Sequence, residues 1–429
     1  MLLAGFARID ITPPLGSLLR GYYYERPADG VLDPLLATAI AFDDGENKAV
    51  LMSLDLCGIP QPMQDRIRQA AAERVGTVPE AVIVHCTHTH QGPHATEEYV
   101  DFLVVRLADA AELAMQDVKP VTYMGFTRGI VERVSFVRRY RMKDGSIRTN
   151  PGRLNPDIVG PVSEPDTMSQ LLVIEREKAK EIGIVNFQVH PDVISGCRIS
   201  ADYPGFVRRT YETLVENSLC MYVNGAQGDS NHIDTSLPKE INSGYKWSRY
   251  MGTKIAASVA SKRELLEELP IGKIRFGQKN ITVKTNKGRP EQMEDAYALK
   301  KIFDEHGRDV AKTYNGTFKT VYDYVEALRI VNMESVPDER ELHLTALSVG
   351  DWVVAGIPGE PFTEIGKAIK RDSLFTLTMP ACCTNGMEGY YPSADCFEEG
   401  GYEVRNARFV KGIAEAITDG SVELVNSLK

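Results

Sequence analysis

Apolar stretches of two different lengths and periods alternate along the chain. The shorter stretches are predominantly apolar runs, which is typical of buried strands. Such runs occupy residues 36–42, 50–56, 81–84, 183–189, 342–349 and 352–357. The longer stretches repeat apolar side chains every three or four positions, as amphipathic helices do. These stretches cover residues 61–75, 97–115, 206–216 and 247–266.

The connections between the strands indicate how the sheets are built. The turn-rich linker at residues 43–47 joins two strands directly, which predicts an antiparallel hairpin. Other strands are separated by whole helices and can lie parallel. We therefore expect an α/β fold in which mixed β-sheets, not purely parallel ones, are flanked by helices. No repeat or clear linker interrupts the chain, so residues 1–429 are predicted to form a single large domain.

Two later regions have less regular patterns. Residues 268–287 have the pattern of a pair of strands. The segments 291–305 and 320–328 have helical periodicity but are rich in polar residues. We therefore expect a polar helical insertion at about residues 288–335 that faces solvent.

The net charge of −10 and the cysteine pattern limit the partners and the compartment. Without a Lys- and Arg-rich run, the chain lacks the features of a nucleic-acid-binding protein. No stretch approaches the ~20 apolar residues of a membrane span, and the apolar start at residues 1–6 is far too short for a signal peptide. Seven cysteines without a CxxC pair indicate free thiols in a reducing compartment. We expect a cytoplasmic enzyme that acts on a small molecule, without nucleic acid or stable membrane association; the oligomeric state stays open.

Half of the eight histidines lie within residues 85–94, just after the apolar run 81–84. They are His85, His88, His90 and His94. The breaker Gln91-Gly92-Pro93 follows, so the cluster is predicted at the end of a core strand, where α/β sheets bind ligands. Along a strand, His88 and His90 would project from one face because they are two positions apart. They could hold one metal ion together, or one could hold the metal while the other moves a proton. That all four are ordinary polar residues is the less favoured alternative.

Further chemically active side chains follow other predicted strands. They are the Arg138-Arg139 pair, His190, Asp229 and Glu360. Two histidines and a carboxylate form a familiar catalytic zinc set that leaves a position open for water. Two simpler interpretations remain open: Glu360 could begin the helix after Pro361, and Tyr390 could be a packed aromatic residue.

Four separated motifs resemble the catalytic domain of the neutral/alkaline ceramidases. They are Thr87-His88-Thr89-His90-Gln91-Gly92-Pro93, Val189-His190-Pro191, Pro358-Gly359-Glu360 and the segment 390–403. The resemblance covers nearly the whole chain, from the opening Asp10-Ile11-Thr12-Pro13 onward. Members of this family are zinc amidases that cleave the N-acyl bond of ceramide. The resemblance implies their catalytic-domain fold, a Zn²⁺ ion and an amidase activity.

The resemblance also implies a set of metal ligands. His88 and His190 match the two zinc-binding histidines. Glu360 matches the carboxylate ligand, and Tyr390 matches the ligating tyrosine. The interval from Tyr390 to Tyr402 equals the interval between the two family tyrosines, which supports this alignment.

Three residues are implied to act on the substrate. His90 matches the histidine beside the metal and would supply a proton to the leaving amine. Tyr402 matches the tyrosine near the scissile carbonyl, and Arg138 matches an arginine of the same pocket, although Arg139 could replace it. Attack on a carbonyl places negative charge on its oxygen, which Tyr402, Arg138 or the zinc could stabilise.

One departure from the family concerns the attacking group. The family segment Gly-Asp-x-Ser-Pro-Asn carries a proposed serine, but the corresponding serine here, Ser230, lies one position early. We therefore expect a metal-activated water to attack the substrate. The loop residues expected to bind the substrate are Asp229, Ser230, Asn231 and His232.

Another departure concerns the substrate. Ceramidases carry an immunoglobulin-like C-terminal domain and usually an export signal, and we expect this chain to have neither. This favours a small soluble N-acyl compound over a membrane lipid. An ester or lactone hydrolase would need the same residues, so that alternative remains open. A zinc-dependent binding protein without turnover also remains open, because Ser230 is displaced.

Overall fold

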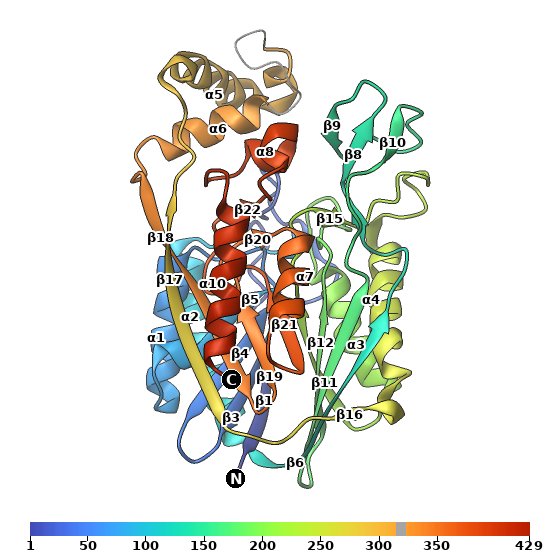
Figure 1. Cartoon of the computed structure of the whole chain (residues 1–429), viewed down its shortest axis with the longest axis vertical. Helices are drawn as coiled ribbons and strands as arrows, with labels where there is room; N and C mark the ends of the chain where they lie inside the picture. The colour runs from blue at the N-terminus through green and yellow to red at the C-terminus, as the bar shows by residue number, and fades with distance from the viewer. Residues whose placement is uncertain (315–322) are drawn as a thin grey trace.

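Two β-sheets packed face to face form the centre of the protein in a computed structural model, which describes residues 1–314 and 323–429 (Figure 1). Among these residues, nine strands form the larger sheet in the order β14-β12-β11-β6-β1-β3-β4-β5, with β16 beside β6. Their bounds are β1 (Leu3–Asp10), β3 (Leu36–Asp43), β4 (Lys48–Leu54), β5 (Val82–Cys86), β6 (Lys119–Ile130), β11 (Met168–Arg176), β12 (Glu181–Phe187), β14 (Ser218–Asn224) and β16 (Glu267–Glu268). The smaller sheet has the order β17 (Ile274–Lys284), β18 (Glu339–Val349), β19 (Trp352–Gly356) and β21 (Leu377–Ala381).

Both sheets are mixed. The pairs β4–β5 and β12–β14 of the larger sheet are parallel, whereas β1–β3 and β3–β4 are antiparallel. In the smaller sheet β19–β21 is parallel and β17–β18 is antiparallel. The predicted α/β fold with mixed sheets flanked by helices is therefore confirmed.

The two-residue period of the strands divides their side chains between two cores. In β3, Ala37, Ala39 and Ala41 face a core shared with the helices α1 (Gln61–Val75) and α2 (Glu97–Gln116). The intervening Ile40 and Phe42 face the smaller sheet, where the Phe42 ring lies 6.0 Å from the ring of Trp352. Because alternate residues of a strand point to opposite faces, a continuous apolar run becomes the middle layer of a stack.

Helices cover the outer face of each sheet (Figure 1). On the larger sheet they are α1, α2, α3 (Asp202–Leu214) and α4 (Gly244–Ala260). On the smaller sheet they are α7 (Thr363–Asp372) and α10 (Ile413–Ser427). The result is a four-layered stack of helices, sheet, sheet and helices.

Short elements connect these layers at the end of the molecule where the candidate site lies. Their bounds are β2 (Gly30–Val31), β7 (Phe136–Val137), β8 (Arg139–Met142), β9 (Ile147–Thr149), β10 (Ile158–Pro161), β13 (Arg198–Ile199), β15 (Ser230–Asn231), β20 (Glu360–Pro361), β22 (Tyr390–Tyr391), α8 (Cys396–Glu399) and α9 (Tyr402–Arg405). Beyond them lie α5 (Pro290–Ala311) and α6 (Asp323–Met333) at the top of Figure 1.

Some predicted elements differ from the observed ones. The range 268–287 contains one long strand, β17 (Ile274–Lys284), rather than a strand pair, and the partner of β17, β18, comes from much later in the chain. The helix expected at 247–266 ends at Ala260. Of the helix expected at 320–328, residues 320–322 lie outside the described ranges. Within the described ranges, no helix has both the length and the apolarity needed to span a membrane.

Candidate active site

The two predicted metal-binding histidines lie side by side. His88 follows β5 and His190 follows β12, and their Nε2 atoms are 3.2 Å apart. Both side chains are buried. β5 ends at Cys86, and His88 has a φ of 74°, so strand alternation does not place His88 beside His90 as expected. Their rings nevertheless lie 5.1 Å apart because the chain turns sharply at His88.

Main-chain carbonyl groups set the tautomer of both histidines. His88 Nδ1 donates to the carbonyl oxygen of Cys57 at 2.6 Å, and His190 Nδ1 donates to that of Gln227 at 3.4 Å. A carbonyl oxygen can only accept, so each Nδ1 carries the proton and each Nε2 keeps its lone pair. When both rings are neutral, two lone pairs face each other inside the protein. This arrangement repels unless a proton or a metal ion lies between them.

Glu360 brings a negative charge to the same point. Its Oε2 lies 3.3 Å from His88 Nε2 and 3.7 Å from His190 Nε2. This buried oxygen has no hydrogen-bond partner among the described residues. Burial raises the pKa of Glu360, but His88, His190 and Arg138 outweigh it and hold the pKa below its ordinary value. The carboxylate is therefore ionised and available as a ligand.

These three groups fit a divalent metal ion. Two neutral imidazoles and a carboxylate are the usual donors of a catalytic zinc site. Ligand atoms on a tetrahedral zinc with bonds of about 2.0–2.2 Å lie roughly 3.3–3.6 Å apart, and the three observed separations run from 3.2 to 3.7 Å. The unpartnered carboxylate oxygen is explained if it binds a cation.

The imidazoles differ in how readily they accept a proton. Burial lowers the pKa of His90 to about 3, assisted by His88, and it lowers the pKa of His190. Burial also opposes protonation of His88, but Cys57 and Glu360 raise its pKa overall. The cluster therefore favours one positive charge beside Glu360, either a proton on His88 or a metal ion that would replace that proton.

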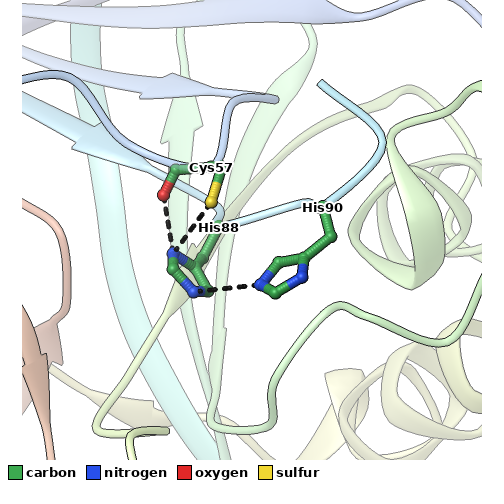
Figure 2. A group of neighbouring side chains, drawn as sticks. All are labelled: Cys57, His88 and His90. Atoms are coloured by element: carbon green, nitrogen blue, oxygen red, sulfur yellow. Dashed lines mark hydrogen bonds between the residues drawn. The ribbon is translucent and has the colours of Figure 1, made fainter. Parts of the chain in front are cut away.

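A second group of potential ligands also contains His88, together with Cys57 and His90 (Figure 2). Cys57 Sγ lies 3.8 Å from His88 Nδ1, and His90 Nε2 lies 3.4 Å from His88 Nε2. Cys57 and His90 therefore approach opposite nitrogens of the ring. Nδ1 already donates to the Cys57 carbonyl, so a metal shared with Cys57 would require that hydrogen bond to break. The group of His88, His190 and Glu360 is the better candidate for a metal centre.

The two predicted tyrosines lie against the metal-ligand group. Tyr390 pairs with Glu360 in the short parallel bridge between β22 and β20, and its ring lies 5.7 Å from that of Tyr402. The Tyr402 hydroxyl lies 3.1 Å from the hydroxyl of Tyr23. Burial raises the pKa of both Tyr390 and Tyr402, so both phenols are neutral at pH 7.

Arg138 lies behind the tyrosines, not among the residues that line the cavity. Its guanidinium carbon is 5.2 Å from the centre of the Tyr390 ring. Its Nε lies 2.7 Å from a carboxylate oxygen of Glu403, and its Nη2 donates to the carbonyl of Gly228 at 2.6 Å. Arg138 also forms a hydrogen bond with Tyr390. This geometry allows Arg138 to position the Tyr390 phenol.

A cavity of about 560 Å³ opens onto the site. His88, His90 and Glu360 line it together with Tyr390 and Tyr402. One side is formed by α6 through the side chains of Val325, Leu328, Arg329, Asn332 and Met333. We expected the helical insertion to face solvent, but it does so only in part. The helix α6 packs against α5 through Leu299, Ala327 and Ile330, and another part of the α6 surface faces the cavity.

The four residues predicted to bind substrate lie outside this cavity. Asp229 accepts hydrogen bonds from the main-chain N–H and the hydroxyl of Thr363 at 2.7 and 2.6 Å, which caps α7. The Ser230 hydroxyl faces the Gln227 carbonyl at 3.5 Å. Asn231 donates to Asn150 at 2.9 Å. His232 Nδ1 lies 3.1 Å from Asp192 and borders a neighbouring cavity.

Three residues of the site were not predicted from the sequence. Gly21 lies so close to His90 that an added Cβ would be 2.4 Å from His90 Nδ1. Tyr23 contacts Tyr402, and Glu403 holds Arg138. The run Gly21-Tyr22-Tyr23-Tyr24 is unusual for an exposed loop, and it was the available signal for the first two. Glu403 follows directly after Tyr402, inside the segment that resembles the ceramidases.

Comparison with known proteins gives a consistent fold. No known family profile matches the chain. The crystal structure of neutral ceramidase from Pseudomonas aeruginosa matches with a TM-score of 0.76 and 17% sequence identity, over 100% of this chain and 74% of that one. A structure described as ceramidase complexed with C2 matches with a TM-score of 0.74 and 16% identity, over 100% of this chain and 75% of that one. The chain therefore has a neutral ceramidase-like fold.

Proposed function

We propose that this protein is a zinc-dependent hydrolase that cleaves the amide bond of a small N-acyl compound. The proposal is carried by one observation: three potential metal-ligand atoms lie close together at one buried point. They are His88 Nε2, His190 Nε2 and Glu360 Oε2. The fold shared with ceramidases supports an amide as the scissile bond. A cytoplasmic location and a single catalytic domain remain predictions from the sequence.

The proposed ligands are His88, His190, Glu360 and Tyr390. A zinc ion bound there would supply Lewis acidity, which polarises a carbonyl and lowers the pKa of water. The main-chain carbonyls of Cys57 and Gln227 hold the two imidazoles in the tautomer that binds a metal.

His90 is proposed as the group that moves the proton. With a pKa of about 3, its imidazole is neutral at pH 7 and begins as a base. It takes a proton from the attacking water and returns that proton to the nitrogen of the leaving amine. Ser230 lies outside the cavity, which favours water over a serine nucleophile.

Tyr402 is proposed to bind the carbonyl oxygen of the substrate. Its phenol is neutral and half-buried at the cavity wall, so it can donate a hydrogen bond to an oxygen that gains negative charge. Tyr23 and Asn406 lie within hydrogen-bonding distance of the same hydroxyl and orient it. Arg138 supports Tyr390 from behind.

The test has two stages. Metal content is first measured on the purified protein and on His88→Ala, with the exposed His306→Ala as the control. Hydrolysis of an N-acyl amine and of the ester with the same acyl group is then compared before and after chelation. We expect metal-dependent amide hydrolysis that His88→Ala abolishes and His306→Ala retains. Hydrolysis of the ester alone would indicate an esterase instead, and bound metal without any hydrolysis would indicate a binding protein.

A further inference from the structure

The cavity beside the candidate metal centre is rich in arginine. Four arginines line it: Arg20, Arg329, Arg340 and Arg408. Of the described residues that line the cavity, Glu360 is the single one with a carboxylate, and it faces the two histidines. The chain as a whole has a net charge of −10, so this local excess of positive charge is not a reflection of composition.

Two of the arginines share one buried carboxylate. Arg340 contacts Glu388 through both nitrogens of its fork, at 2.6 and 3.1 Å. Arg408 Nη1 lies 3.6 Å from the same carboxylate. The Arg340 and Arg408 side chains are 28% and 43% exposed, whereas that of Glu388 is 5% exposed. One negative charge beneath two guanidinium groups leaves a net positive charge at the cavity surface.

The positive charge of a third arginine, Arg329, is also only partly neutralised by a carboxylate. Arg329 of α6 lies 3.6 Å from Glu326, and Arg405 contacts the same carboxylate. Arg329 also donates to the carbonyl of Arg405 and is buried, so it holds α6 against α9. We assign it a structural role that adds to the local positive charge.

Arg20 has no carboxylate partner at all within residues 1–314 and 323–429. Its Nη1 donates to the main-chain carbonyl of Gly58 at 3.0 Å, which points the guanidinium along the cavity wall. A single hydrogen bond to a carbonyl leaves most of the N–H donors of the Arg20 guanidinium group available.

Part of the remaining cavity wall is apolar. Leu328, Met333, Val336 and Met387 contribute to it. An organic ligand that is apolar over part of its length and anionic at one position would match both features. Guanidinium groups bind carboxylates through paired, charge-assisted hydrogen bonds and are preferred at such sites.

We propose that the substrate carries an anionic group, of the carboxylate type, and that Arg20, Arg340 and Arg408 bind it. The protein would thus select N-acyl compounds that are organic acids over neutral amides. The cleavage step rests on the proposed amidase function, whereas the binding step does not. The anionic group could belong to the amine half or to the acyl half of the substrate, so the test contains both.

In each of two pairs of probes, a neutral group in one member replaces the carboxylate of the other. N-benzoylglycine and N-benzoylethanolamine share the acyl group and differ by a carboxylate in the amine half. N-phenylsuccinamic acid and N-phenylbutyramide share the amine and differ by a carboxylate in the acyl half. We expect the acid of at least one pair to have a kcat/KM roughly tenfold or more above that of its neutral partner, because charged hydrogen bonds are lost in the latter. The pair that shows the preference identifies the half that carries the anionic group.

The variants are chosen so that no carboxylate loses its closest partner. Arg20→Met removes an arginine that has no acid, and Arg408→Met leaves Glu388 with Arg340. Each is expected to lower kcat/KM for the acid by roughly 10–100-fold and to leave the neutral amide unchanged. Arg408→Lys keeps the charge and should recover part of the loss. Arg141→Met, at an exposed arginine of β8 that does not line the cavity, should have no effect.

Calorimetric binding of both acids to the metal-loaded protein separates the two proposals. If no amide is cleaved but an acid binds, and binds roughly tenfold more weakly to Arg408→Met, the amidase proposal fails and the anion site stands. If both members of each pair are cleaved equally, the anion site is overturned and the amidase proposal stands. If neither acid binds, the proposed anion site is also overturned.

Discussion

The carbonyl oxygen of Cys57 lies 2.6 Å from His88 Nδ1, and this contact follows directly from the sheet. β4 and β5 are parallel neighbours with Leu54 opposite Cys86, so the two chains leave the sheet together. Residues just after β4 therefore lie beside residues just after β5, and the His88 N–H also donates to the carbonyl of Leu56 at 2.8 Å. A parallel strand pair thus orients the metal-facing nitrogen of His88 without any dedicated side chain.

Replacing Glu360 tests whether its negative charge is needed for metal binding. Glu360→Gln keeps the volume of the side chain but removes the one negative charge beside the two histidines. We expect the affinity for Zn²⁺ to fall by more than the roughly 10–100-fold that is typical of groups that only orient a ligand. Competition with a chelator of known affinity measures it. Glu364→Gln, 61% exposed on α7, is the control and should bind zinc as the unmodified protein does.

The two tyrosines are predicted to separate metal binding from catalysis. Tyr390→Phe removes the phenol next to Glu360 and should weaken zinc binding by at least the roughly 10–100-fold that follows the loss of an orienting group. Tyr402→Phe removes a donor at the cavity wall and should lower kcat by about 10²–10³-fold while zinc binding is retained. Zinc titration and steady-state kinetics on both variants measure the two effects. Equal loss of zinc in both variants would contradict the assigned roles.

Many of the strands and helices could be predicted from the local spacing of apolar residues. The runs 36–42 and 50–56 correspond to β3 and β4, and the periodic segment 61–75 corresponds to α1, because burial on one or two faces imposes a regular spacing on the sequence. The range 268–287 was misjudged because β17 is half-exposed, and its partner β18 is separated from it by the whole helical insertion. Pairing over such a distance has no local signature.

The candidate site was accessible for a different reason. His88, His190 and Glu360 were singled out as polar residues at strand ends, where α/β proteins bind ligands. Their meeting at one point needed the tertiary structure, because β5 and β12 are not neighbours in the larger sheet and Glu360 belongs to the separate pair β20–β22. The argument that His88 and His90 share a strand face failed because a left-handed residue, His88, breaks the strand first. The position of the loop around Ser230 could not be inferred, since Asp229 is bound to Thr363 of α7 by contacts that no spacing reveals.

Asp202 is predicted to make stability depend on pH. Burial raises its pKa from 3.8 to about 6, although it accepts main-chain hydrogen bonds from Val193 and Tyr203. The folded state therefore holds the proton more tightly than the unfolded state, so this contribution is present below pH 4 and is lost as the pH rises through 6. Relative to Asp202→Asn, the free energy of unfolding should fall by about 2 kcal/mol between pH 4 and pH 7. Chemical denaturation of both proteins across this range measures the difference, and parallel pH curves would refute the assignment.

Gly21 is predicted to matter through the ring of His90. An added Cβ would lie 2.4 Å from His90 Nδ1 and 2.5 Å from Cγ, so the imidazole would have to move. Nδ1 is buried and has no hydrogen-bond partner among the described residues, so packing rather than a hydrogen bond holds the ring on that side. The packing of Gly21, with the Tyr22 ring 5.7 Å away, is what keeps His90 Nε2 directed at the metal-ligand group.

Gly21→Ala should therefore lower kcat by about 10²-fold, the usual cost of displacing a reacting group by about 1 Å, while zinc binding is retained. Gly16→Ala provides a matched control, because Gly16 has a similar φ of +88° against +105° for Gly21, but no atom within 4 Å of its added Cβ. Both variants carry the same backbone strain, and Gly21→Ala alone meets the imidazole. Steady-state kinetics and zinc titration on the two variants distinguish the causes. If both lose activity equally, loop strain rather than displacement of His90 is responsible, and the role assigned to Gly21 is wrong.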